Sequence, residues 1–207
     1  MAIDHAGFVL FPEYIVFRLI GRLSMPIFAY CIARGVYYSN NKGTFKRYII
    51  NMLIFAVLSQ IPYYFFNGPY HLNIGFTWLL SMILLYIIIK KKRRHILPAC
   101  VIIGVISVLM PVEYSFLGSF LPVIFYWSAV KKNNFSYAFI GVTIITTGYI
   151  ILNNNGAVII QFLSILAVPL IAILQRYDSK IKLPKWFFYV FYPAHILLLM
   201  VIKQLFS

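Results

Sequence analysis

Two histidines of this 207-residue chain lie inside apolar stretches, where an imidazole is uncommon. Near the C-terminus, His195 follows Tyr192 and Pro193 within the apolar stretch from Lys185 to Met200. A helix rises about 1.5 Å per residue, so this stretch is long enough to cross a bilayer, with the histidine near its middle. An ionisable group at that depth must face protein or trapped water. His195 therefore marks either a functional site or a hydrogen bond that packs two helices together.

The second histidine, His5, follows Asp4 in the first apolar segment. A carboxylate that accepts a hydrogen bond from an imidazole orients the ring and raises its basicity, as a general base requires. Neighbouring side chains on a helix point about 100° apart, so Asp4 need not contact His5. Asp4 has an alternative partner in Arg18, in the following loop, or in Arg22, at the start of the next segment. The residue types therefore indicate either general-base catalysis or a structural ion pair.

The composition excludes a soluble domain. The chain is 62% hydrophobic and 11% charged, whereas soluble domains have about 25% charged residues. A net charge of +14 would suggest nucleic acid in a soluble protein. Here the cations stand in short runs between apolar segments, so membrane topology explains them and no nucleic-acid partner is expected. The two cysteines lie in apolar runs without metal-ligand spacing, so we expect no metal.

The apolar runs predict an all-α, polytopic helical membrane protein that forms a single domain over residues 1–207. We expect about nine transmembrane helices. The first run is too short to span, which predicts either a half-helix or a truncated helix whose native residues precede Met1. The expected segments are 1–12, 20–38, 48–66, 74–89, 96–112, 116–130, 137–152, 157–175 and 186–205.

Basic residues are concentrated in alternate loops, at 42–47, 90–94, 131–132 and 176–185. The intervening loops hold only Arg18. By the positive-inside rule, the N-terminus is then cytoplasmic and the C-terminus external. With this orientation, the polar residues of the spans collect in the middle and outer half of the membrane.

The ordered set of short motifs resembles one known family, the TraX family of membrane acetyltransferases, which belongs with the transmembrane acyltransferases. The resemblance extends over nearly the whole chain, and it is the order of the pieces that makes it specific. Glu113-Tyr114 stands where the family usually has Asp-Tyr, and the family usually has more apolar residues before its Asp-His pair. The motifs are DHAG at Asp4–Gly7, IGRLSMPIFAYCIARG at Ile20–Gly35, SQIPY at Ser59–Tyr63, LNIGFT at Leu72–Thr77 and FFYVFYPAHILLL at Phe187–Leu199.

The resemblance implies a multi-pass enzyme of the bacterial cytoplasmic membrane. Such an enzyme takes an acetyl group from cytoplasmic acetyl-CoA and transfers it to an acceptor at the membrane or its outer face. The favoured acceptor is the N-terminal amine of an exported or pilin-like peptide. The alternative acceptor is a hydroxyl of a cell-surface glycan.

The resemblance also carries site residues onto this chain. We expect His5 to act as the general base, with Asp4 orienting it and His195 as a further member of the catalytic group. The same motifs hold Pro26 and Pro193. The expected substrate-binding residues are Arg22, Ser59, Gln60, Asn73, Thr77 and Tyr192. Basic residues at the cytoplasmic side are expected to bind the phosphates of acetyl-CoA, namely Arg34, Arg47, Lys90 and Arg93. The alternative is that these residues only set the topology, as a basic run beside a membrane usually does.

Two other classes of protein are compatible with the same residues. In a small-solute transporter the polar groups would line a path through the membrane, but transporter folds usually show paired repeats, and none is evident. In a non-catalytic scaffold the polar groups would only join helices. Small residues within the spans also permit a homo-oligomer. Binding of acetyl-CoA separates the enzyme from both alternatives.

Overall fold

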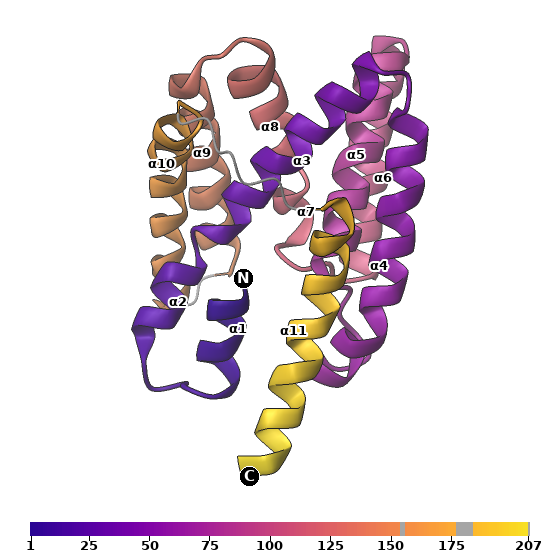
Figure 1. Ribbon diagram of the computed structural model, residues 1–207. Coiled ribbons are helices and arrows are strands. Elements are labelled where there is room, and N and C mark those ends of the chain that lie inside the picture. Colours follow the sequence, from indigo (N-terminus) through magenta and orange to yellow (C-terminus); the bar gives the residue numbers. More distant parts are fainter. Residues whose placement is uncertain (154–155, 177–183, 207) are drawn as a thin grey trace.

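A computed structural model describes residues 1–153, 156–176 and 184–206 (Figure 1). Lys180 and Lys182 of the last basic loop lie outside the described residues. The described chain is helical throughout, apart from turns and one isolated parallel bridge between Leu72 and Val112. The elements are α1 (Ala2–Val9), α2 (Ile15–Gly21), α3 (Ser24–Asn41), α4 (Phe45–Asn67), α5 (Ile74–Lys90), the 3₁₀ turn η1 (Arg93–His95), α6 (Ile96–Leu109), α7 (Ser115–Gly118), α8 (Leu121–Phe125), the π-helical η2 (Tyr126–Lys131), α9 (Phe135–Asn153), the 3₁₀ helix η3 (Gly156–Leu166), α10 (Ala167–Leu174) and α11 (Lys185–Phe206).

Each of the nine predicted segments contains helix, but several are interrupted. The segment expected at 20–38 starts earlier, as α2, and α3 follows after Arg22 and Leu23. The segment at 116–130 is divided into α7, α8 and η2, and the one at 157–175 into η3 and α10. These breaks shorten the continuous helices, so that several fall below the length that a bilayer requires.

Four helices in the described part are long and apolar enough to cross a membrane, judged by length and composition. The all-helical class is thus confirmed, and the apolar helices support a membrane protein. The number of nine spans and the sides of the two termini stay predictions. The four candidate spans are Ile15–Asn41, Phe45–Asn67, Phe135–Leu152 and Trp186–Leu205.

The helices form two groups that α3 connects (Figure 1). α4, α5 and α6 lie on one side, α9 and α10 lie on the other, and α11 packs against α4 and α1. The connections α3–α4, α5–α6 and η2–α9 share the upper end in Figure 1, and the C-terminus lies at the lower end. The basic residues of these three connections therefore gather at one end of the bundle, as the alternation of charged loops predicts.

The core lies around α3, whose small residues allow close helix packing. Ala29 and Ala33 are fully buried there, and the side chain of Phe125 from α8 fills the space beside them. In a membrane the hydrophobic effect does not drive helices together, so their association depends on van der Waals packing. Small residues at the interface let the backbones approach closely enough for that packing. This packing fixes α3 between the two groups, and α2 and α1 are positioned from its N-terminal end.

Candidate functional site

The two histidines of the apolar segments meet inside the protein. Nδ1 of His5, on α1, lies 2.9 Å from Nε2 of His195, on α11. The rings are stacked, with centroids 5.1 Å apart and an interplanar angle of 14°. Both side chains are buried, with exposed fractions of 5% and 8%. The structure thus brings together the first and last helices through two of the residues that the sequence singled out.

The hydrogen bonds of this pair determine which ring nitrogens carry hydrogen. Nδ1 of His195 lies 2.8 Å from the carbonyl oxygen of Phe191, which can only accept, so Nδ1 must donate. In a neutral imidazole the other nitrogen is then an acceptor, and Nε2 of His195 must receive the hydrogen of His5 Nδ1. Nε2 of His5 is left with its lone pair. The chain of bonds therefore prepares His5 as a proton acceptor.

Aromatic rings surround the histidine pair. The Phe66 ring lies 5.2 Å from His5, and the Phe191 ring stacks on His195 at 5.2 Å. Tyr192 approaches both imidazoles edge-on, at 6.2 and 5.5 Å. Such rings exclude water, and electrostatic interactions are stronger in the resulting low-dielectric surroundings.

Asp4 and the glycine that faces it set the position of α1. The Asp4 carboxylate lies 3.3 Å from Nη1 of Arg18 on α2, which is one of the two ion pairs considered from the sequence. A Cβ atom at Gly21 would overlap Cβ of Asp4 and lie 2.6 Å from its Oδ1. Gly21 is thus needed for the close approach of α2 to α1. In this arrangement the hydrogen-bond partner that orients His5 is His195.

A buried carboxyl that was not among the expected site residues is that of Glu113. Its backbone is hydrogen-bonded at both its N–H and its carbonyl. The Glu113 N–H donates to the Leu72 carbonyl at 3.1 Å, and the Thr77 hydroxyl, on α5, donates to the Glu113 carbonyl at 2.7 Å. The Ile74 N–H donates to the carboxyl, and Arg22 and Asp4 are close enough to act on it electrostatically. Burial, followed by the negative charge of Asp4, raises the pKa of Glu113 to about 7.

Tyr114, next to Glu113, is joined to Arg22 by a hydrogen bond between side chains. Tyr114 has φ of 65°, an uncommon backbone conformation for a residue other than glycine. The sequence carried a signal for this pair, because the chain has only four acidic residues and Glu113-Tyr114 occupies a family motif position. The two residues extend the site from α1 and α11 to the turn before α7.

Several buried polar atoms of the site have no partner within the described residues. Buried polar groups are almost always hydrogen-bonded, so a cluster of unpaired ones indicates a place for water or a ligand. Ser59, which the sequence predicts to bind substrate, is among them. The unpaired groups are Nε of Arg22, Oγ of Ser59, Oε2 of Glu113 and the O–H of Tyr192, and Oδ1 of Asp4 has only its ion pair with Arg18.

The side chains of Gln60, Asn73 and Thr77 are hydrogen-bonded to other groups of the protein. The Asn73 amide donates to the Ala56 carbonyl and to Gln60 Oε1, both at 2.8 Å, and its own oxygen caps α5 by accepting from Gly75 N–H. Gln60 also donates to the His71 carbonyl at 2.9 Å. These bonds join α4 to the start of α5. They support a positioning role for the three residues behind the site.

The four expected phosphate-binding residues lie away from the histidines, on or beside the basic end of the bundle. Arg34 lines a pocket of about 220 Å³. Arg47, Lys90 and Arg93, which are exposed like Arg34, line neither this pocket nor the one beside Met25 and Tyr114. No group of three potential metal ligands occurs among the described residues.

The membrane-length apolar helices of the described chain and its buried polar site are those of a helical membrane protein. Within that class, the family described as "TraX protein" matches residues 1–203, so the chain belongs to the TraX family. An uncharacterized protein of Rickettsia prowazekii (strain Madrid E) is 32% identical over 108 residues. That match spans 42% of this chain and 42% of the relative's length. No solved structure matches the chain.

Proposed function

We propose that this protein is an acetyl-CoA-dependent membrane acetyltransferase in which His5 is the general base. The observation that carries the proposal is the direction of the hydrogen bonds from His5 through His195 to Phe191, which leaves Nε2 of His5 free to accept a proton. A base in this position suits an acceptor whose N–H or O–H must lose a proton as it attacks a thioester. Membership of the TraX family supports the same chemistry.

The proposed step conserves atoms and charge. Nε2 of His5 takes a proton from the acceptor amine or hydroxyl, and the acceptor atom bonds to the acetyl carbonyl carbon. The tetrahedral oxyanion collapses, the carbon–sulfur bond breaks, and His5 returns the proton to the leaving thiolate of coenzyme A. The products are the acetylated acceptor and free coenzyme A.

Arg22 and Tyr192 are suited to stabilise the oxyanion. Nε–H of Arg22 and the O–H of Tyr192 are buried donors, and neither donates a hydrogen bond within the described chain. A hydrogen-bond donor that is already positioned toward the oxyanion in a site without water typically contributes on the order of 10²–10³-fold in rate. These unpaired donors are therefore assigned to the transition state.

A peptide amine is the favoured acceptor, and a glycan hydroxyl is the alternative. The buried carboxyls of Asp4 and Glu113 can accept hydrogen bonds, and a neutral amine, the form that attacks a thioester, offers two N–H donors to them where a hydroxyl offers one. The donor would enter from the cytoplasmic side and the acceptor from the outer side, as the distribution of basic loops predicts. The proposed location is the bacterial cytoplasmic membrane.

Turnover of acetyl-CoA by detergent-purified protein tests the proposal. Release of coenzyme A is followed with a thiol reagent, in the presence and absence of a peptide with a free N-terminus. His5→Gln should lower turnover by about 10²–10⁴-fold, because an amide cannot accept the proton. His95→Gln, at the exposed basic end, is the matched control. Equal turnover by wild type and His5→Gln would refute the assignment of the base.

A further inference from the structure

The pocket that Arg34 lines lies far along α3 from the histidines. It has a volume of about 220 Å³, and its walls come from α3, from the end of η2 and from the residue after α10. From Ser24, three residues after the glycine that faces Asp4, to Arg34 the axis of α3 rises about 15 Å. The lining residues are Tyr30, Arg34, Tyr37, Tyr38, Ala129, Val130, Asn133 and Gln175.

The side chains of the pocket hold one guanidinium in a defined place. Nη2 of Arg34 donates to the Tyr38 hydroxyl at 3.0 Å, and the guanidinium lies over the rings of Tyr38 and Tyr30, at 5.5 and 5.9 Å. Tyr30 is itself fixed, because its hydroxyl donates to Gln175 at 3.1 Å. A guanidinium has five N–H donors, so most of those of Arg34 stay available for a ligand. An arginine held in this way recognises a phosphate through paired hydrogen bonds.

Among the described residues, the charged side chains at the pocket and directly beside it in the sequence are all basic. None of the described residues that line it is acidic. Lys131 and Lys132 directly precede the lining residue Asn133, and Arg176 follows the lining residue Gln175. Such an arrangement attracts an anion and repels a cation.

The backbone of one wall is unusual. Residues Tyr126–Lys131 form a π-helix, a rare conformation that is frequent at functional sites. Asn133 follows with φ of 50°, in the left-handed region, and the Asn134 N–H donates to the Ser128 carbonyl at 2.9 Å. These features wrap the chain around the pocket, and a lipid-facing helix alone would not require them.

From these observations we infer that this pocket binds the phosphates of a nucleotide, namely the adenosine 3′-phosphate 5′-diphosphate end of the acyl-CoA donor. This inference rests on the proposed function, and it assigns to Arg34 a role that Arg47, Lys90 and Arg93 do not share. Arg34 pairs with the phosphates. The exposed ring of Tyr38 and the half-buried ring of Tyr37 offer faces on which the adenine can stack.

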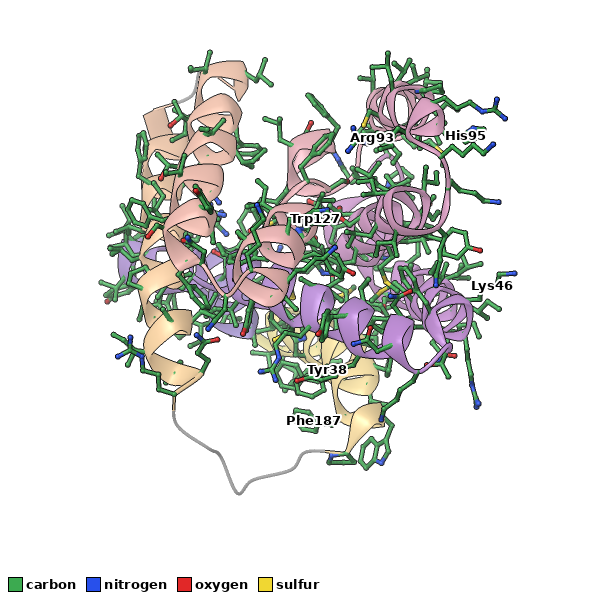
Figure 2. All side chains as sticks on the ribbon, turned by 90° about the horizontal axis from the view of Figure 1, so that it is seen from above. Tyr38, Lys46, Arg93, His95, Trp127 and Phe187 are labelled. Atoms are coloured by element: carbon green, nitrogen blue, oxygen red, sulfur yellow. The ribbon has the colours of Figure 1, made fainter. Side chains whose placement is uncertain are left out.

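Calorimetric titration with coenzyme A, in neutral detergent, tests this assignment. Arg34→Gln should weaken binding by about tenfold to a hundredfold, the usual effect of losing a hydrogen-bonded charge. Arg34→Lys should recover only part of the affinity, because an ammonium lacks the planar pair of donors. Lys46→Gln is the matched control: it removes one charge from the same end, and Figure 2 shows Lys46 at a different edge from Tyr38.

Two further binding measurements distinguish a nucleotide phosphate from the phosphate of a lipid headgroup. Adenosine 3′,5′-bisphosphate lacks the pantetheine arm, and its affinity should fall by a similar factor in Arg34→Gln. Nanodiscs with phosphatidylglycerol or phosphatidylcholine test a lipid headgroup instead. Retention of phosphatidylglycerol that depends on Arg34, with unchanged affinity for coenzyme A, would overturn the nucleotide assignment.

The outcomes also separate this inference from the proposed function. If wild type and Arg34→Gln bind coenzyme A equally, the pocket is wrongly assigned and the role of His5 is untouched. If Arg34→Gln binds coenzyme A weakly while His5→Gln has the turnover of the wild type, the assignment of the pocket is supported and the catalytic proposal is wrong. If folded wild type binds no coenzyme A, both are wrong. The expected result is normal binding by His5→Gln without turnover, and weak binding by Arg34→Gln.

Discussion

His5 and His195 are 190 positions apart in the sequence, and their ring nitrogens lie 2.9 Å from each other. The bond joins the first helix of the chain to the last, and the Phe191 carbonyl fixes its direction. A histidine that served only to pack helices would have no need of a free lone pair on one side. The relationship therefore makes His195 the residue that selects the tautomer of His5.

The first prediction concerns this tautomer. His195→Ala leaves the buried Nδ1–H of His5 without an acceptor, and turnover should fall by about 10- to 100-fold. His195→Gln places an amide oxygen near the position of Nε2 and should recover much of the loss. Steady-state coenzyme A release measures both variants, with Phe188→Ala on an exposed face of α11 as the control. Equal activities of the two His195 variants would contradict the tautomer argument.

The second prediction concerns the packing of α1 on α2. Gly21→Ala forces a Cβ atom into Asp4, so α1 must shift and His5 must move with it. We expect a loss of about 1–3 kcal/mol in stability, typical of an overpacked contact, together with lower turnover.

Gly104→Ala is the matched control for this contact. A Cβ atom at Gly104, within α6, would meet nothing within 4 Å. Alanine favours helix over glycine by about 0.5–1 kcal/mol, so this variant should be as stable as the wild type or slightly more stable. Thermal unfolding in detergent measures both variants. A Gly21→Ala protein with normal stability and turnover would show that α1 tolerates displacement.

The third prediction separates positioning from substrate binding at Asn73. Asn73→Ala removes the cap of α5, leaves the Ala56 carbonyl without its donor and leaves Gln60 Oε1 with only the backbone N–H of residue 73, so it should lower stability by about 2–4 kcal/mol. Asn73→Asp keeps a capping oxygen but loses both donated bonds, and it should also be destabilising. A melting curve near that of the wild type, combined with a raised KM for the acceptor, would instead favour direct contact with substrate.

The fourth prediction concerns the pH dependence of stability through Glu113. Its pKa is about 7 in the folded chain, above the ordinary value of 4.5, so the folded state holds a proton that the unfolded state releases between these values. The free energy of unfolding should therefore fall as the pH rises through this interval. Glu113→Gln abolishes this dependence and should be more stable than the wild type at about pH 8, by on the order of 2 kcal/mol, with little difference near pH 4.

Unfolding in detergent at several pH values tests this sign. Glu13→Gln changes an exposed carboxyl and serves as the control. A Glu113→Gln variant with the same pH profile as the wild type would show that the pKa of Glu113 is the same in the folded and the unfolded chain.

The fifth prediction concerns the orientation in the membrane. Tyr70 is 81% exposed in the turn between α4 and α5, and Lys46 stands at the basic end. In a variant with Cys31 and Cys100 replaced by serine, Tyr70→Cys should react with an impermeant maleimide on intact cells. Lys46→Cys should react only after permeabilisation. The reverse pattern would invert the proposed sides of donor and acceptor.

The sequence by itself determined the helical class, the approximate positions of the apolar segments and the family. Apolar run length and the placement of lysine and arginine are local properties of the chain, and they follow directly from its solvent, the bilayer. The ordered motifs likewise lie in short stretches, so Asp4, His5, Arg22 and His195 were recognisable as a set.

Only the tertiary structure decided which of these residues meet. In a membrane chain the core and the lipid-facing surface are equally apolar, so Leu84, which is 1% exposed, cannot be told from Leu97, which is 73% exposed, by residue type. Helix faces are therefore poorly marked, and so are the breaks that divide the expected spans. The pairing of His5 with His195 and the pocket at Arg34 depend on how helices far apart in sequence pack together, and the choice of Arg18 rather than Arg22 as the partner of Asp4 depends on the packing of α1 on α2. Sequence alone does not encode that packing in any local pattern.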